Sequence, residues 1–268
     1  MKTVFSPVDF SDASRNALLF ATELSKRANA RLVVINIMQE DDDQAEADKK
    51  LKDIELDLKK SFGANLNCET LTARGELVAS MKEIIRDQKP DIIVMGTKGA
   101  SGLKRILIGS NTVNVIAKTS VPVLVIPDVA RFENFLLKGK NEIVLATDLD
   151  AVENDAAFDI LKEIALLIIK PKIKILSVRP KNTDIDYLKR MERNALLSVF
   201  RPEIESERKT VFGSNVIEGI NYYLNTHADT GLVAMIARDT GHLIQKHYTR
   251  EMASHTHLPL LVLHDAQM

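Results

Sequence analysis

Short apolar runs alternate along the chain with longer segments that have a helical apolar period. The runs at 31–37 (RLVVINI) and 91–95 (DIIVM) are almost continuously apolar. This pattern is typical of strands that are buried on both faces of a parallel sheet. Before the first of these runs, Ala13, Ala17 and Leu24 recur at the spacing of one helix face. The first half therefore reads as strands separated by amphipathic helices.

Extending this interpretation predicts the elements of the first half. Strands are expected near 2–8, 31–37, 67–73, 91–96 and 122–126, and helices near 12–29, 43–62, 76–88 and 110–118. Strict alternation favours right-handed crossovers and a doubly wound α/β fold. Ligands of such folds bind beyond the carboxyl ends of the strands. Asp9, Ile37 and the segment after Met95 are expected at this edge.

The second half repeats the pattern of the first. Residues 3–9 (TVFSPVD) and 143–148 (IVLATD) are apolar segments that end in aspartate, and 121–127 (VPVLVIP) resembles 258–264 (LPLLVLH). Copies roughly 138 residues apart indicate a duplicated domain rather than a solenoid. Strands of the second half are expected near 141–147, 172–178, 204–211, 231–236 and 260–264.

We therefore expect two Rossmann-like α/β domains in tandem, at 1–128 and 141–268, with a linker at 129–140. Each domain is expected to hold a five-stranded parallel sheet of strand order 3-2-1-4-5.

Composition narrows the function classes. The formal net charge of −1 creates no global field toward nucleic acid or acidic membranes, and the absence of tryptophan argues against single-strand recognition. The apolar runs are too short to span a bilayer, and the N-terminus does not resemble a signal peptide. We expect a cytoplasmic protein with neither a membrane nor a nucleic-acid partner. The lone Cys68 excludes an intrachain disulfide.

A glycine-rich segment follows the fourth expected strand. It runs from Gly96 to Ser110 (GTKGASGLKRILIGS). Glycines let backbone N–H groups turn toward an anion, and the start of a helix favours phosphate. Ser110 is expected to be the N-cap of that helix, and Lys98 adds positive charge, as do Lys104 and Arg105. The Walker and dinucleotide motifs are both absent. A flexible surface loop is the alternative, because glycine spacings of this kind also occur by chance.

These residues carry a resemblance to a known family. Gly96-x2-Gly99-x9-Gly109-Ser110 resembles the ATP-binding signature of the universal stress protein family, and residues 7–11 (PVDFS) resemble its first strand and turn. The resemblance implies that Asp9 bonds the adenine edge, that Ile37 packs beside the base and that Gly96 admits the ribose and α-phosphate. It assigns the phosphates to Gly99, Gly109 and Ser110. The remaining positions expected in the nucleotide site are Pro7, Met95, Lys98 and Asn111. A local role for Asp9, as a helix cap or a partner of Ser11, stays open.

The second half departs from this signature. Ile236 stands where Gly96 is expected, and Lys246 and His247 replace Gly109 and Ser110. A β-carbon at these places would obstruct close backbone approach. The second half is therefore expected to lack the phosphate site and to serve as a pairing domain or to bind a different ligand. All six histidines lie in this half without a ligand motif, so no metal site is predicted.

The leading hypothesis is a stress-response regulator whose first domain binds ATP, with magnesium as an open companion ion. No acidic residue lies between Gly96 and Ser110 to hold a metal or a water, so no catalytic residue is predicted and the protein is expected not to be an enzyme. A slow ATPase and a purely structural pairing module are the alternatives. The resemblance further implies an intrachain pseudo-dimer, and association of two chains stays open.

Overall fold

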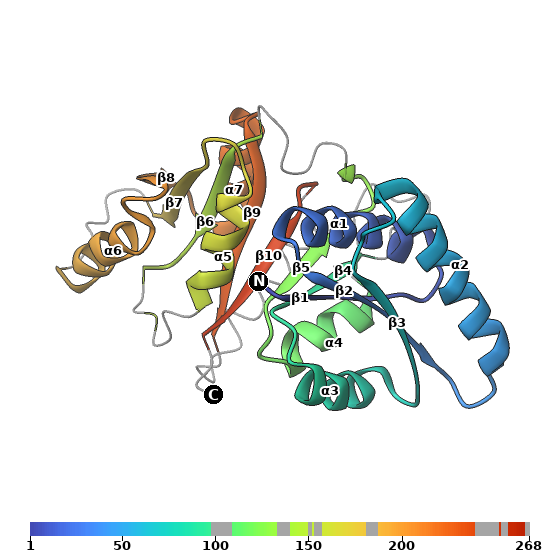
Figure 1. Ribbon diagram of the computed structural model, residues 1–268. Coiled ribbons are helices and arrows are strands. Elements are labelled where there is room, and N and C mark those ends of the chain that lie inside the picture. Colours follow the sequence, from blue (N-terminus) through green and yellow to red (C-terminus); the bar gives the residue numbers. More distant parts are fainter. Residues whose placement is uncertain are drawn as a thin grey trace. The chain divides into compact units, whose positions relative to one another are not determined.

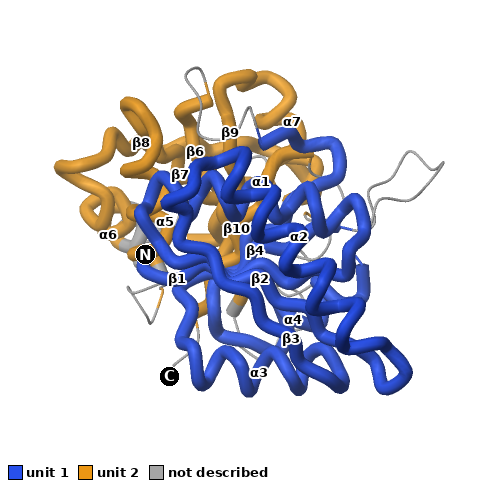
Figure 2. Tube along the Cα trace, turned by 45° about the vertical axis from the view of Figure 1, so that its right-hand side comes forward, with its two compact units in different colours: residues 1–132 blue, residues 133–268 orange. Residues whose placement is uncertain are grey.

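The chain folds into two compact α/β units, residues 1–132 and 133–268 (Figures 1 and 2). The computed structural model describes residues 1–97, 109–132, 140–149, 152, 157–180, 187–238, 252 and 257–265.

The first unit is built on a parallel sheet of order β3-β2-β1-β4-β5. The strands are β1 (Thr3–Pro7), β2 (Arg31–Met38), β3 (Cys68–Arg74), β4 (Ile92–Gly96) and β5 (Val123–Ile126). All four neighbouring pairs are parallel, and the side chains of β1 and β5 are buried throughout. Burial on both faces explains the continuous apolar runs in the sequence, and the predicted strand order is confirmed.

In the described part of this unit, four helices cover the sheet. They are α1 (Asp12–Ala28), α2 (Gln44–Phe62), α3 (Leu77–Gln88) and α4 (Ser110–Lys118). Figure 1 shows α1 and α2 on one face and α3 and α4 on the other. Side chains cap the first three helices: Ser11, Asp43 and Glu76 each accept a hydrogen bond from an N–H of the first turn. These caps satisfy donors that a helix start otherwise leaves without partners.

The second unit has the corresponding parallel sheet, of order β10-β9-β6-β7-β8. Its strands are β6 (Glu142–Ala146), β7 (Lys172–Arg179), β8 (Glu205–Phe212), β9 (Thr230–Arg238) and β10 (Leu260–Asp265). In chain order this is again 3-2-1-4-5, as predicted, and the neighbouring pairs are parallel. The described helices of this unit are α5 (Ala157–Leu166), α6 (Tyr187–Phe200) and α7 (Val216–Thr226).

Strand register places the two sheets in correspondence residue by residue. Val4 of β1 lies beside Ile92 of β4, and Ile143 of β6 lies beside Leu232 of β9. Counting four residues along β4 and β9 from these partners leads to Gly96 and Ile236. Ile236 therefore occupies the Gly96 position, as the sequence comparison predicted.

Cys68 and Tyr223 are two buried side chains with polar atoms. Cys68 begins β3 and is buried; burial raises the pKa of its thiol to about 11, so the thiol is unreactive at neutral pH. Tyr222 and Tyr223 are consecutive residues of α7. Tyr223 is buried and donates to Glu142, whereas Tyr222 is 67% exposed. The two side chains differ because consecutive helical residues point in different directions.

Candidate functional site

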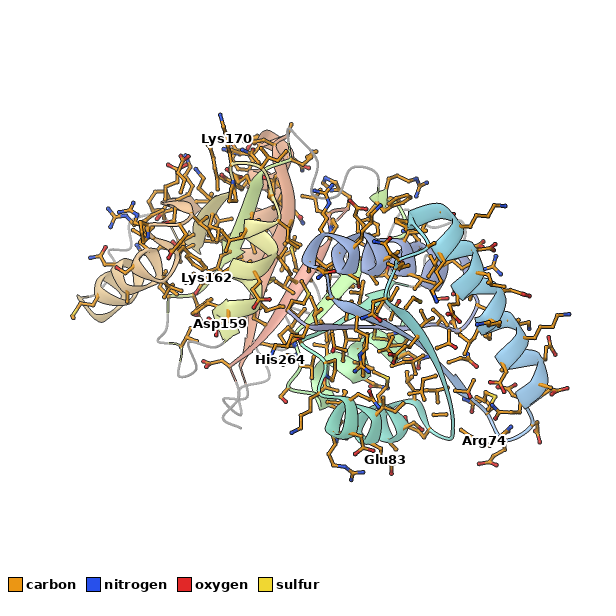
Figure 3. The ribbon with its side chains drawn as sticks, viewed as in Figure 1. Arg74, Glu83, Asp159, Lys162, Lys170 and His264 are labelled. Atoms are coloured by element: carbon orange, nitrogen blue, oxygen red, sulfur yellow. The ribbon has the colours of Figure 1, made fainter. Side chains whose placement is uncertain are left out.

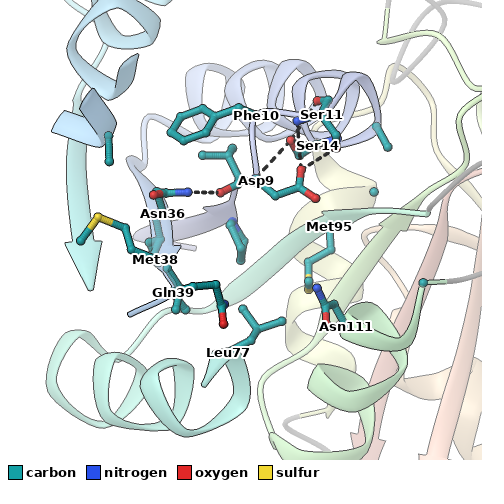
Figure 4. Close-up of a pocket in the computed structure, with 18 of the residues that line it drawn as sticks. Asp9, Phe10, Ser11, Ser14, Asn36, Met38, Gln39, Leu77, Met95 and Asn111 are labelled. Carbon is teal, nitrogen blue, oxygen red and sulfur yellow. Dashed lines mark hydrogen bonds between the residues drawn. The ribbon is translucent and has the colours of Figure 1, made fainter. Parts of the chain in front are cut away.

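A cavity of about 690 Å³ opens at the carboxyl ends of β1, β2 and β4, beside the start of α4 (Figure 4). Its volume falls within the range typical of small-molecule sites. Helices α1, α2 and α3 also contribute to its wall through Ala13, Glu46 and Leu77. The cavity lies where a doubly wound fold is expected to bind its ligand.

The cavity brings together most of the predicted site residues. Those that line it are Pro7, Asp9, Ile37, Met95, Gly96, Gly109, Ser110 and Asn111. They come from four elements and their connecting segments, spread over more than a hundred positions of the chain. Lys98 and Gly99 lie outside the described residues, as do Lys104 and Arg105.

Asp9 lies in the turn between β1 and α1 and is held by two serines. Its Oδ1 accepts from the backbone N of Ser11 at 3.1 Å and from the Ser11 hydroxyl. Partial burial opposes ionisation, but the hydrogen bonds from Ser11 and Ser14 outweigh it and lower the pKa of the carboxyl below its usual range. Asp9 is thus ionised at neutral pH. The structure therefore shows the local role of Asp9 as a partner of Ser11, although Ser11 rather than Asp9 caps α1.

The start of α4 differs from the other helix starts of this unit. Gly109, not Ser110, is its N-cap, because the carbonyl of Gly109 accepts the first intrahelical bond, from Val113 N at 3.2 Å. The expectation that Ser110 caps the helix is wrong, and Ser110 is the first helical residue. Gly109 supplies no side-chain cap. The first-turn amides of α4 therefore receive no bond from the capping residue and are suited to an anion.

Gly96 connects the site to two helices. A β-carbon at this position would lie 2.5 Å from the carbonyl oxygen of Ala13 in α1. The Gly96 carbonyl accepts from Thr112 Oγ1 of α4 at 2.9 Å. Close packing of α1 against β4 therefore requires glycine here whether or not a ligand approaches, which is a reason the sequence could not reveal.

The part of the cavity across from the start of α4 is formed around the end of β2. Asn36 is buried and donates through Nδ2 to the Val8 carbonyl at 2.8 Å, which joins the ends of β1 and β2. Ile37, Met38 and Leu77 add apolar wall. This region combines apolar contact with the nearby Asp9 carboxylate, which suits a planar group with polar edges.

The segment that joins β2 and α2 also lines the cavity, which the sequence pattern did not predict. Its lining residues are Gln39, Asp42 and Asp43, and the wall continues into α2 with Glu46, Ala47 and Lys50. Phe10, in the turn between β1 and α1, is a further lining residue that was not predicted. Asp43 was interpreted only as part of a helix start, which is confirmed: it accepts from Ala45 N and Glu46 N. The available signal was that this segment follows the carboxyl end of an inner strand.

Arg74 fixes that segment from the end of β3 (Figure 3). Its guanidinium donates to the backbone carbonyls of Gln39 at 2.6 Å, Glu40 at 2.5 Å and Asp42 at 2.9 Å. Because Gln39 and Asp42 line the cavity, Arg74 shapes its wall without lining it.

Within the described residues, no group of three or more histidine, cysteine or acidic side chains is arranged to hold a metal ion. None of the described helices is both long and apolar enough to cross a membrane.

The second unit keeps part of this arrangement. Asp148 follows β6 by two residues, as Asp9 follows β1, and Leu149 has a left-handed φ of 64°, like the 62° of Phe10. The side chain of Ile236 stands at the position of Gly96. Lys246 and His247 lie outside the described residues.

Sequence comparison with known proteins matches about half of this chain. Residues 1–127 match the model of the universal stress protein family. A universal stress protein of Methanocaldococcus jannaschii is 29% identical over 144 residues, covering 47% of this chain and 81% of the relative. One of Bacillus subtilis is 27% identical over 139 residues, covering 44% of this chain and 94% of the relative.

Structural similarity extends over both units. The crystal structure of a universal stress protein from Archaeoglobus fulgidus covers 98% of this chain and 98% of its own, with a TM-score of 0.75 at 18% identity. At this identity the match shows the fold alone.

Proposed function

We propose that the first unit, whose residues 1–127 match the model of the universal stress protein family, binds ATP in the cavity between β1, β2, β4 and α4. The observation that carries the proposal is the start of α4. Its first turn borders the cavity, and its N-cap, Gly109, offers no side-chain acceptor. Such amides, at the positive end of a helix, form a ready site for phosphate.

Each part of the nucleotide has a matching part of the cavity. The ionised Asp9 can accept from the exocyclic amine of adenine, and Ile37 and Leu77 offer apolar contact to the base. The phosphates would lie against Gly109, Ser110 and Asn111. Lys98 and Gly99 complete the phosphate site in this proposal, since both belong to the signature segment. Magnesium would enter only as the partner of the triphosphate.

We propose a regulator rather than a catalyst. Phosphoryl transfer needs an oriented nucleophile and charge stabilisation, often with a metal held by carboxylates. The signature segment from Gly96 to Ser110 contains no acidic residue to serve this purpose. Occupancy by ATP would instead favour one state of the protein over another. The second unit, with Ile236 in place of Gly96, would serve as a pairing domain or bind a different ligand.

Calorimetric titration of the full chain with ATP tests the proposal. The Gly109→Val substitution should abolish detectable ATP binding, because the new side chain occupies the space in front of the α4 amides. Circular dichroism should show an intact fold, since this position is a helix cap where valine costs only about 1 kcal/mol. Unchanged ATP affinity in this variant would refute the phosphate assignment.

A further inference from the structure

Phe10 is held in an unusual backbone conformation. Its φ of 62° lies in the left-handed region. A bulky L-residue loses stability in this conformation, whereas glycine does not. Phe10 lies between Asp9 and Ser11 in the turn that joins β1 to α1. Residues in sparsely populated conformations concentrate at functional sites, where the strain is retained for a reason.

The second unit has a corresponding turn with a left-handed residue, so this turn is a feature of the fold itself. Asp148 and Leu149 follow β6 as Asp9 and Phe10 follow β1, and Leu149 has a φ of 64°. Glycine would adopt this conformation without strain in both units. Both units carry a large apolar side chain instead, so in each the side chain must have a use that offsets the strain.

That use differs between the two units. Leu149 is 2% exposed and is part of the core of its unit. Phe10 is only half-buried and lines the cavity. Lys50, which also lines the cavity, places its ammonium 5.2 Å from the centre of the Phe10 ring. This cation–π contact helps to hold the ring in place, and the Glu46 carboxylate holds the ammonium at 2.6 Å.

The position of Phe10 indicates which part of a ligand it can reach. In Figure 4 the Phe10 ring lies on the side of the pocket next to Asn36, whereas Asn111 at the start of α4 lies on the opposite side. The Asp9 carboxylate lies between these two regions, beside Ser11 and Ser14. The ring is therefore remote from the proposed phosphate end of the cavity.

We propose that Phe10 is a ligand-contact residue whose ring packs against the base end of the bound molecule and favours a planar aromatic group there, with Lys50 holding the ring. This inference rests on the proposed function for the identity of the ligand. It explains why strain is retained at this turn: the first unit uses the side chain for its ligand, and the second uses the corresponding side chain for its core.

The test compares Phe10→Gly and Leu149→Gly in the full chain, titrated separately with ATP and with AMP. Phe10→Gly should weaken the binding of both nucleotides by about tenfold. Base–aromatic packing contributes roughly this much to affinity, and the two nucleotides share the same base. Its melting temperature should stay close to that of the wild type, because relief of strain offsets the lost contacts. Leu149→Gly should leave both affinities unchanged and lower the melting temperature, since it removes a core side chain.

Three outcomes would overturn the inference: wild-type affinity in Phe10→Gly, a loss confined to ATP, or a fall in melting temperature as large as that of Leu149→Gly. Phe10→Leu decides the case if Phe10→Gly fails to fold. It should remain stable, as leucine is at position 149, and bind both nucleotides more weakly than the wild type; wild-type binding would contradict the proposal. The proposed function fails separately, if the wild-type chain itself binds no ATP.

Discussion

Gly96 illustrates how one residue can serve two purposes. It lies at the end of β4 on the cavity wall, and it also faces the backbone of α1 at Ala13. A signature glycine is readily attributed to the ligand alone. Here the close approach of a helix is sufficient to require it, so the absence of a side chain at Gly96 is not by itself a sign of nucleotide binding.

This contact leads to a stability prediction. Gly96→Ala should destabilise the protein by about 2 kcal/mol or more, because the new methyl group would lie 2.5 Å from a backbone oxygen that cannot move without shifting α1. Urea denaturation measures the effect. Gly213→Ala is the control, because its β-carbon would meet its nearest atoms only at 3.7 Å. Equal stability of the two variants would show that α1 adjusts freely.

At the scale of elements, the segment joining β2 to α2 is held in place partly by a side chain of another element, β3. The Asp43 side chain begins α2, and the Asp42 carboxylate accepts from Gln39 N at 2.7 Å. Arg74 of β3 then binds three carbonyls of the same segment. Neighbouring strands of the sheet thus define one wall of the cavity together, through contacts between their ends.

Removal of Arg74 should loosen this wall. In Arg74→Ala we expect amide hydrogen exchange at 39–42 to accelerate roughly fivefold, which corresponds to about 1 kcal/mol of lost hydrogen bonding. ATP affinity should fall with it, while exchange in β1 stays slow. Arg86→Ala is the matched control, because Arg86 is exposed on α3 and bonds the Asp87 side chain. Identical exchange in both variants would mean that Arg74 does not organise the segment.

At the scale of the whole molecule, two units of the same topology differ at the edge where the first unit has its cavity. The strand orders are identical when each is counted in chain order. Residues at this edge differ: Gly96 corresponds to Ile236, and a cavity-lining Phe10 corresponds to a buried Leu149. The fold is retained because the buried strands of both units remain apolar.

This asymmetry predicts the stoichiometry of binding. The full chain should bind one ATP, in its first unit, as measured by calorimetry or native mass spectrometry. Asp9→Asn should weaken binding, because an amide replaces an ionised acceptor at the proposed base edge. The matched variant Asp148→Asn should leave ATP affinity unchanged. Two equivalent sites per chain, or equal effects of the two substitutions, would contradict the asymmetry.

The sequence by itself determined the elements, their order and the edge of the sheet where the cavity lies. Apolar runs and helical stripes are local patterns that burial imposes on each element, so β1 to β5 and their helices could be predicted closely. The same patterns located Asp9, Ile37 and the end of β4 at Gly96, because the carboxyl ends of inner strands meet at one edge.

Only the tertiary structure decided what each residue at that edge does. The contact of Gly96 with Ala13, the bonds from Arg74 to the segment after β2, and the different surroundings of Phe10 and Leu149 join residues from different elements. No periodicity encodes such contacts, since they arise only when helices and strands pack against one another. The sequence therefore determined which elements border the site, and packing between elements determined the contacts that form its walls.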